Sequence, residues 1–400
     1  MSTDIDRRRL FYAAAALSAL GAAGAGAPAL ARAEDATAEG GPSPLPDRGL
    51  DPGVPHDGDY AKVELAKPVV TLGVVQSRVR GIDASTSRTA SRGRADNLNH
   101  MLELIDASFA WGGPKDILFF HEFPITGYRA NWGRADTLRA AIEIPGEETE
   151  AIARKARQYN CWIVFGSYAR DDSWPNHVLS ITSVMDNTGT IVDKHWKARN
   201  IKGLFGPGFE LFTTTIYDVL DEYIERYGLD HVMPVTRTPL GNIVTSAVQR
   251  EPELMRAFAM KGGELFLRTA TGGFTPTDIA STSLHNSVYT AIVNNAISPG
   301  NPGFFEDAGN SGGSTIYGPD GGAMAQAGSQ FETIVTARLP MAQFRQRHTI
   351  PYVHMDLYRP IFDAYRNRFP PNLFTDYQPT DTADAARYLA DKGVWAMDRR

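Results

Sequence analysis

The sequence predicts an α+β (α/β) fold in which two mixed β-sheets pack face to face and helices cover each sheet. Over residues 67–345, apolar runs typical of buried strands alternate with stretches of helical spacing, as in layered proteins of this class. Hairpin signals such as Asp186-Asn187-Thr188-Gly189 interrupt the alternation, and a purely parallel sheet would lack them. The chain has 400 residues and 42% hydrophobic content, which is enough for a core of this size.

The first half of the domain is expected to supply one sheet and its helices. Leu98, Met101, Leu102 and Ile105 recur at the spacing of one helix face. The strands are rich in β-branched and aromatic residues. The predicted elements are strands at residues 69–76, 116–120 and 162–168, a hairpin at 177–185 and 190–194, helices at 97–109 and 151–159, and a long Arg/Ser-rich loop at 77–94.

The second half is expected to supply the other sheet, arranged around one strand-to-helix turn. Ile243, Val244 and Thr245 suit a buried strand, and Pro252 suits the first position of a helix. A turn signal at Pro319-Asp320-Gly321 separates two later strands. The predicted elements are a short helix at 218–227, the strand at 243–245, the helix from 252 to Gly262, a strand at 264–268, helical spacing at 283–293, and strands at 314–317, 323–327 and 333–339.

The two ends of the chain differ from the domain in their amino-acid composition. Arg8-Arg9-Leu10-Phe11, the small-residue run at 13–29 and the A-x-A site Ala31-Arg32-Ala33 together resemble a twin-arginine export signal at 1–33. A plain secretory signal or a membrane anchor is the alternative. Residues 34–66 are expected to form a linker or arm, and 346–400 a C-terminal extension that packs along the body or a partner subunit. We therefore expect an exported protein, periplasmic or extracellular, with no membrane contact after cleavage.

Composition argues against several classes of function. The net charge is −6 and no Lys/Arg cluster follows the leader, so no nucleic-acid partner is expected. The single cysteine, Cys161, excludes an intramolecular disulfide and a thiolate-rich zinc site. The nine histidines show no HExxH-type spacing, so neither a metal nor another cofactor is expected. Cys161 itself is expected to be a buried apolar residue.

The turn after residues 243–245 has the geometry of a nucleophile elbow, because a strand that runs sharply into a helix exposes backbone N–H groups at the helix N-terminus. Here the turn carries Ser246, Ala247 and Val248, and no cysteine. Arg250 and Glu251 follow, and they could bind a charged substrate or form a helix cap and salt bridge.

Several stretches in series resemble the nitrilase (carbon–nitrogen hydrolase) superfamily, in its aliphatic amidase and formamidase branch. The matching stretches cover most of about 280 residues in the family's order. They are HEFPITGY at 121–128, IPGEETEAIARKARQYNCWIVFG at 144–166, GTIVDKHWKARN at 189–200, ELMRAFAMKGGELFLR at 253–268, NN at 294–295 and GGSTIYGPDGGAMAQAG at 312–328. The resemblance implies a four-layer α-β-β-α sandwich, a small amide- or nitrile-like ligand, and a homodimer or higher homo-oligomer.

The family hydrolyses amides and nitriles with a glutamate base, a lysine that stabilises the oxyanion, and a cysteine nucleophile. Glu122 matches the glutamate, at the mouth of the strand at 116–120, where burial raises a carboxyl pKa toward that of a base. Lys197 matches the lysine, and Lys194 is its rival on the opposite face of the strand. Tyr128 and Trp196 are candidates for an apolar substrate pocket, although aromatic residues are as often part of a core.

The chain departs from the family pattern at two positions. Counting back from Pro252 places the family's cysteine at Ser246, whereas counting forward from Gly241 places it at Val248, and Ala247 lies between them. The amidases' second glutamate, in an Ile-Glu-Gly context, falls on Lys202 of Ile201-Lys202-Gly203. Lys202 is therefore a further candidate for ligand binding.

Two hypotheses follow from these departures. The chain is either a catalytically altered protein that kept the fold and binds an amide- or nitrile-like ligand, or an active hydrolase with different chemistry. In the second case Ser246, Thr245 or a water activated by Glu122 would attack, with Lys197 at the oxyanion. A sealed pocket, or Glu122 bound to Lys202, would argue against the enzyme.

Overall fold

The computed structural model describes residues 51–55, 58–200, 211–301, 305–306 and 310–394. The predicted signal at 1–33, most of the predicted arm at 34–66, and Lys202 lie outside these ranges. Within the described part of the chain, no helix is long and apolar enough to cross a bilayer.

Two six-stranded mixed sheets form the centre of the domain. The first has the order β12-β1-β2-β3-β4-β5 and the second β11-β10-β9-β8-β7-β6. β1, β2 and β3 are parallel to one another, as are β7, β8 and β9, and the flanking strands are antiparallel. The strands are β1 Val70–Gln76, β2 Ile117–Phe120, β3 Trp162–Ala169, β4 Leu179–Met185, β5 Ile191–Trp196, β6 Thr236–Thr238, β7 Gly241–Ser246, β8 Leu265–Thr269, β9 Tyr289–Val293, β10 Thr315–Tyr317, β11 Ala323–Gln326 and β12 Thr333–Leu339.

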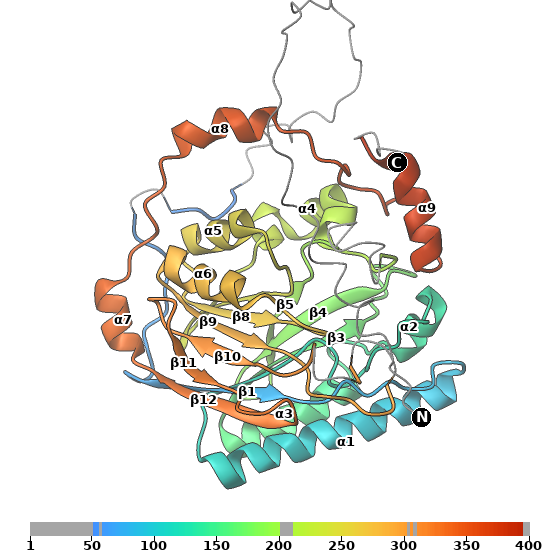
Figure 1. Cartoon of the computed structure of the whole chain (residues 1–400), viewed down its shortest axis with the longest axis horizontal. Helices are drawn as coiled ribbons and strands as arrows, with labels where there is room; N and C mark the ends of the chain where they lie inside the picture. Colours follow the sequence, from blue (N-terminus) through green and yellow to red (C-terminus); the bar gives the residue numbers. More distant parts are fainter. Residues whose placement is uncertain (1–50, 56–57, 201–210, 302–304, 307–309, 395–400) are drawn as a thin grey trace, which may run out of the picture. The chain divides into compact units, whose positions relative to one another are not determined.

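Helices cover the outer face of each sheet, so the fold has the predicted α-β-β-α layers. Figure 1 shows α1 and α3 on one side of the strands, and α5 and α6 on the other. The helices are α1 Ser87–Gly112, α2 Arg134–Ala140, α3 Glu147–Tyr159, α4 Leu220–Tyr227, α5 Pro252–Met260, α6 Pro276–Asn286, α7 Met341–Arg347, α8 Met355–Ala364 and α9 Thr382–Lys392, with 3₁₀ turns η1 Ile216–Val219 and η2 Leu229–Val232.

The core follows from strand alternation, because successive side chains point to opposite faces of a sheet. Leu72 and Phe119 from the first sheet meet Ile243 and Leu267 from the second in the layer between the sheets. On β7 the next residue, Val244, instead packs outward beneath α5. Thr245 therefore faces the space between the sheets, like Ile243.

Two predicted elements are wrong in extent. The loop predicted at 77–94 ends at the N-cap Thr86, and α1 begins at Ser87, because Thr86 and Thr89 form a reciprocal capping box. The helical spacing at 283–293 belongs partly to a strand: α6 ends at Asn286, Ser287 is left-handed, and the β-branched and aromatic run that follows forms β9.

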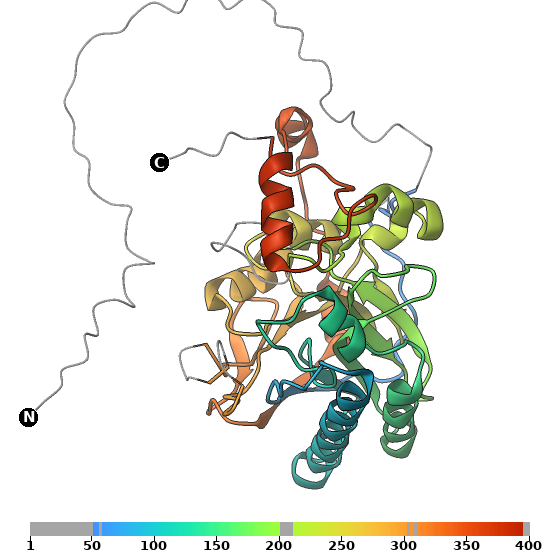
Figure 2. The same cartoon turned by 90° about the vertical axis from the view of Figure 1, so that its right-hand side faces the viewer.

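The C-terminal extension contains helices and contacts the domain. Phe374 donates from its backbone N–H to the Asp218 carbonyl at 3.0 Å, and Arg134 of α2 donates to the Thr380 carbonyl at 2.7 Å. Figure 2 shows α9 on the same side of the domain as α2. In α8, by contrast, Leu357, Ile361 and Phe362 are all exposed.

Candidate functional site

Glu122 lies at the end of β2, in the loop that β2 opens into, and is 8% exposed. Its Oε2 accepts a hydrogen bond from Thr271 Oγ1 at 2.8 Å, and its Oε1 lies 3.8 Å from Lys197 Nζ. The neighbouring strand can approach only because residue 166 is a glycine, since a Cβ there would lie 2.5 Å from Glu122 Cα. Glu122, the candidate base, and Lys197, the candidate cation, are 75 residues apart in the chain, and the fold brings them side by side.

Hydrogen bonds hold the backbone on either side of Glu122 and at Lys197. The buried His121 ring accepts the Phe123 N–H at Nδ1, at 3.0 Å, and so donates from Nε2 to Ser77 Oγ, at 2.9 Å. Burial lowers the pKa of His121 to about 4, so it is neutral at physiological pH. Lys197 is held by its backbone, whose N–H donates to the Ser180 carbonyl at 2.9 Å.

A large cavity of about 1110 Å³ reaches this pair. Its wall includes Glu122, Lys197, Ala247 and Tyr128, together with amide side chains such as Asn294. Beneath it lies a small cavity of about 20 Å³, lined by Ser246 and Thr245 among others. Three residues line both spaces, namely Glu122, Lys197 and Ala247. Ala247 therefore stands at the junction of the two cavities, beside the carboxylate and the ammonium.

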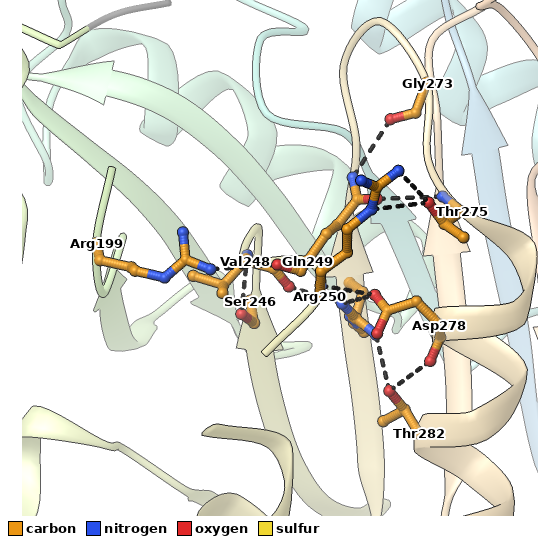
Figure 3. Close-up of polar contacts among 10 residues, drawn as sticks. Arg199, Ser246, Val248, Gln249, Arg250, Gly273, Thr275, Asp278 and Thr282 are labelled. Atoms are coloured by element: carbon orange, nitrogen blue, oxygen red, sulfur yellow. Dashed lines mark hydrogen bonds and ion pairs between the residues drawn. The ribbon is translucent and has the colours of Figure 1, made fainter. Parts of the chain in front are cut away.

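The elbow itself, residues 246–251, follows β7 as the sequence predicts. Ser246 Oγ accepts the backbone N–H of Val248 at 3.1 Å, and Pro252 begins α5. Gln249 ties the elbow to the loop after β8, because its side chain donates to the Gly273 carbonyl and accepts the Thr275 N–H, at 3.3 and 3.2 Å. Figure 3 shows these contacts.

A buried arginine, Arg268, holds the backbone of the elbow through hydrogen bonds. Arg268 of β8 is 1% exposed and donates to the Val248 carbonyl at 2.6 Å, to Asp278 Oδ2 at 2.8 Å and to Thr282 Oγ1 at 2.8 Å. Asp278 also accepts the backbone N–H of Arg250 at 3.2 Å (Figure 3). One ion pair between β8 and α6 thus fixes the backbone on both sides of Gln249.

Arg250 and Glu251 have separate surroundings. Arg250 lines the large cavity, has the left-handed φ of 57°, and donates from its guanidinium to Thr275 Oγ1 at 3.2 and 3.3 Å. A non-glycine residue in this conformation is held there by its neighbours. Glu251 is ion-paired with Arg199 at the start of α5, which matches the salt-bridge alternative considered for it.

Trp196 and Lys194 lie on the opposite face of β5 from Lys197 and border a separate cavity, although Trp196 also lines the small cavity. Trp196 packs edge to face against Trp174 at 5.2 Å, and Lys194 Nζ is 3.9 Å from Asp171. Tyr128, in contrast, lines the large cavity and packs edge to face against Phe305 at 5.6 Å. Of the two predicted pocket aromatics, Tyr128 lines the large cavity, whereas Trp196 lines the small cavity but not the large one.

Three contributors to the site were missed by sequence reasoning. Thr271 and Arg268 lie at the carboxyl end of β8, where parallel strands commonly place polar side chains, and this position was the available signal. The third is His195, whose Nδ1 lies 2.9 Å from Thr245 Oγ1 and whose Nε2 lies 3.1 Å from Asp193 Oδ2. In the neutral tautomer Nε2 carries the proton, because a carboxylate only accepts.

The chain's thiol lies outside the site. Cys161 directly precedes β3 and is fully buried, as predicted, and burial raises its pKa to about 12. Among the residues that the structure describes, no group of three His, Cys, Asp or Glu side chains could hold a metal ion.

Comparison with known proteins supports the family suggested by these features. Residues 80–349 match the model of the carbon–nitrogen hydrolase family. Among solved structures, a double mutant of the amidase from Nesterenkonia sp. AN1 in complex with acrylamide is similar, with a TM-score of 0.52 and 15% identity over 75% of this chain and 99% of that one. An amidase from Nesterenkonia sp. is also similar, with a TM-score of 0.52 and 15% identity over 74% of this chain and 98% of that one.

A further mutant of the same amidase shows covalent addition of the acetamide moiety of fluoroacetamide at its active-site cysteine, again with a TM-score of 0.52 and 15% identity, over 75% of this chain and 99% of that one. At this identity the structures establish a shared fold. The family model covers well over half of the chain. The protein described here belongs to the carbon–nitrogen hydrolase (nitrilase) superfamily.

Proposed function

We propose that this protein is a catalytically altered carbon–nitrogen hydrolase-like protein that binds a small amide- or nitrile-type ligand in the large cavity. The observation that carries the proposal is Ala247, which lies at the junction of the two cavities beside Glu122 and Lys197, where a nucleophile would be expected. An amide group has a donor and an acceptor, and a carboxylate next to an ammonium offers it both partners.

A second candidate is hydrolysis by water, and the small cavity favours it over attack by Ser246. A volume of about 20 Å³ suits one water molecule, and Glu122, Lys197 and Thr245 supply polar partners. Glu122 would take a proton from this water as its oxygen bonds to the amide carbon, and Lys197 would face the oxyanion. Collapse would then break the C–N bond, and Glu122 would return the proton to the departing amine.

A ligand panel separates these functions. Acetamide, butyramide and propionitrile are titrated calorimetrically into the wild type, Glu122→Gln and Ser246→Ala, and ammonia release is followed in parallel. We expect binding without turnover, and Glu122→Gln should weaken amide binding roughly 10- to 150-fold, the equivalent of one hydrogen bond to a charged group. Glu143→Gln is the matched control, since Glu143 pairs with Arg170 at the surface.

Each other outcome identifies a different mechanism. Wild-type ammonia release that is lost in Glu122→Gln but kept in Ser246→Ala would establish the water route. Loss in both variants would indicate the serine. If none of the ligands binds to the wild type, the proposal of an amide- or nitrile-binding protein is wrong.

We further propose that the protein is exported, periplasmic or extracellular, and that it forms a homodimer or higher homo-oligomer. The twin arginines and the A-x-A site support export, and the family resemblance supports self-association. Cell fractionation with N-terminal sequencing should find a chain outside the cytoplasm that begins after Ala33, and light scattering should give at least twice the monomer mass. An intact N-terminus in the cytoplasm, or a monomer, would contradict the respective proposal.

A further inference from the structure

A second substantial cavity, of about 530 Å³, lies on the other side of β5. We call it the outer cavity. It is bordered by the N-terminal half of α3, the edge strand β5 and α4, and it shares no lining residue with the large cavity. Its volume is in the range of small-molecule sites. None of the functions discussed above uses it.

Three aromatic rings form one wall of the outer cavity. Trp196, Tyr223 and Tyr227 all line it, and their rings contact one another at 5.2 Å (Trp196–Tyr223), 4.8 Å (Tyr223–Tyr227) and 6.4 Å (Trp196–Tyr227). Trp174 holds the group from behind, because its Nε1 donates to the Tyr227 hydroxyl at 2.9 Å. The wall is therefore rigid before any ligand arrives.

The same aromatic cluster already holds one cation. The guanidinium of Arg226 lies 4.5 Å from the centre of the Trp174 ring, and Trp174 contacts Trp196 edge to face. The negative face of an aromatic ring attracts cations, and the attraction grows when water is excluded. The rings that border the outer cavity offer the same chemistry to a ligand.

The remaining polar lining is mostly anionic. Glu150, Asp171 and Asp193 line the outer cavity. Glu150 pairs with Arg157 at 2.6 Å, and the one lysine in the lining, Lys194, lies 3.9 Å from Asp171. Burial alone would raise the pKa of Asp193, but hydrogen bonds from His195 and Thr236 outweigh it and lower that pKa to about 2. This carboxylate is therefore ionised throughout the physiological range.

We propose that the outer cavity binds a small organic cation, a primary ammonium or guanidinium group on an apolar body. The charged head lies against the aromatic wall within reach of Asp171 and Asp193, and the body packs on apolar residues such as Met185 and Ile191. These carboxylates would repel an anion, whereas an ammonium can share Asp171 with Lys194 and Asp193 with His195, their present partners. The inference is independent of what the large cavity binds.

The test is calorimetric titration of the full chain with hexylammonium, hexanol and hexanoate, three ligands that share one apolar body. We expect hexylammonium to bind at least about 10-fold more tightly than the other two. Tyr227→Ala should weaken hexylammonium roughly 2- to 30-fold, the range of one cation–π contact. Tyr227→Phe also loses the hydrogen bond from Trp174 but keeps the ring, so it should retain most of the affinity that Tyr227→Ala loses. Tyr365→Ala, at 57% exposure at the end of α8, is the surface control.

The remaining outcomes each exclude the proposal in a distinct way. Equal affinity for hexanol and hexylammonium would mean a merely apolar pocket. Displacement of hexylammonium by millimolar Mg²⁺ would indicate a metal site instead. Loss of hexylammonium binding in Glu122→Gln would place the cation in the large cavity, and an equal effect of Tyr365→Ala would show non-specific association. No binding of hexylammonium would overturn the inference.

Discussion

Replacing Ala247 with cysteine is expected to create amide hydrolysis. The new sulfur would enter the junction of the two cavities, where Glu122 and Lys197 are already in place and where space allows one more heavy atom without displacing the core. An adjacent cation favours the thiolate, and a positioned carboxylate adds about 10²- to 10⁴-fold by proton transfer. Ammonia release from butyramide should therefore rise at least about 10²-fold above the wild-type rate.

Control variants make this result specific to the position. Ser246→Cys and Val248→Cys test the two registers obtained by counting along the sequence, and both should stay near the wild-type rate. Adding Glu122→Gln to Ala247→Cys should remove the gained activity. If Val248→Cys is the variant that gains turnover, the count from Gly241 is correct and the placement of Ala247 is wrong.

Substituting Arg268 by methionine is expected to destabilise the fold by about 3–5 kcal/mol, the usual loss when one partner of a buried ion pair is removed. The substitution leaves Asp278, whose side chain is 14% exposed, without its cation, and leaves the Val248 carbonyl without its donor. Urea denaturation of both proteins measures the difference in the free energy of unfolding. The elbow should loosen first, since Arg268 holds its backbone.

The matched control is Arg387→Met in α9. Arg387 pairs with Asp384 at 3.1 Å, but its side chain is 73% exposed, and such surface pairs contribute about 0–1 kcal/mol. The double variant Arg268→Met/Asp278→Leu should recover part of the loss, because no charge then stays buried. A loss below about 1 kcal/mol for Arg268→Met alone would refute a supporting role for this pair.

The strands could be predicted from sequence because their apolar, β-branched runs leave few alternatives, as in β1 and β2. Helix ends were harder: the start of α1 depends on a single capping box at Thr86, in a stretch whose arginines and serines are as common in loops. The β9 segment was mistaken for helix because Ile292 and Val293 continue the apolar spacing of α6, and only Ser287, at φ 52°, breaks the helix.

Only part of the candidate site could be predicted from the sequence. The likeness to a family brought Glu122 and Lys197 together, and the alternation of β5 separates Lys197 from Trp196. The contacts of Thr271, Arg268 and His195 depend on the register between strands and on how the two sheets are stacked. The sequence pattern of a single segment determines neither the strand register nor the stacking of the sheets. These three residues could therefore be identified only from the three-dimensional structure.

The burial of Cys161 has a practical consequence for studying the elbow. Alkylating reagents react with accessible thiolates, and the chain's one native thiol is sealed in the core with a pKa of about 12. The folded wild-type protein is therefore not expected to react with alkylating reagents. A cysteine placed in the elbow becomes the one reactive thiol of the folded protein. The pH dependence of its alkylation gives the pKa of that thiol, which reports the electrostatic effect of Glu122 and Lys197.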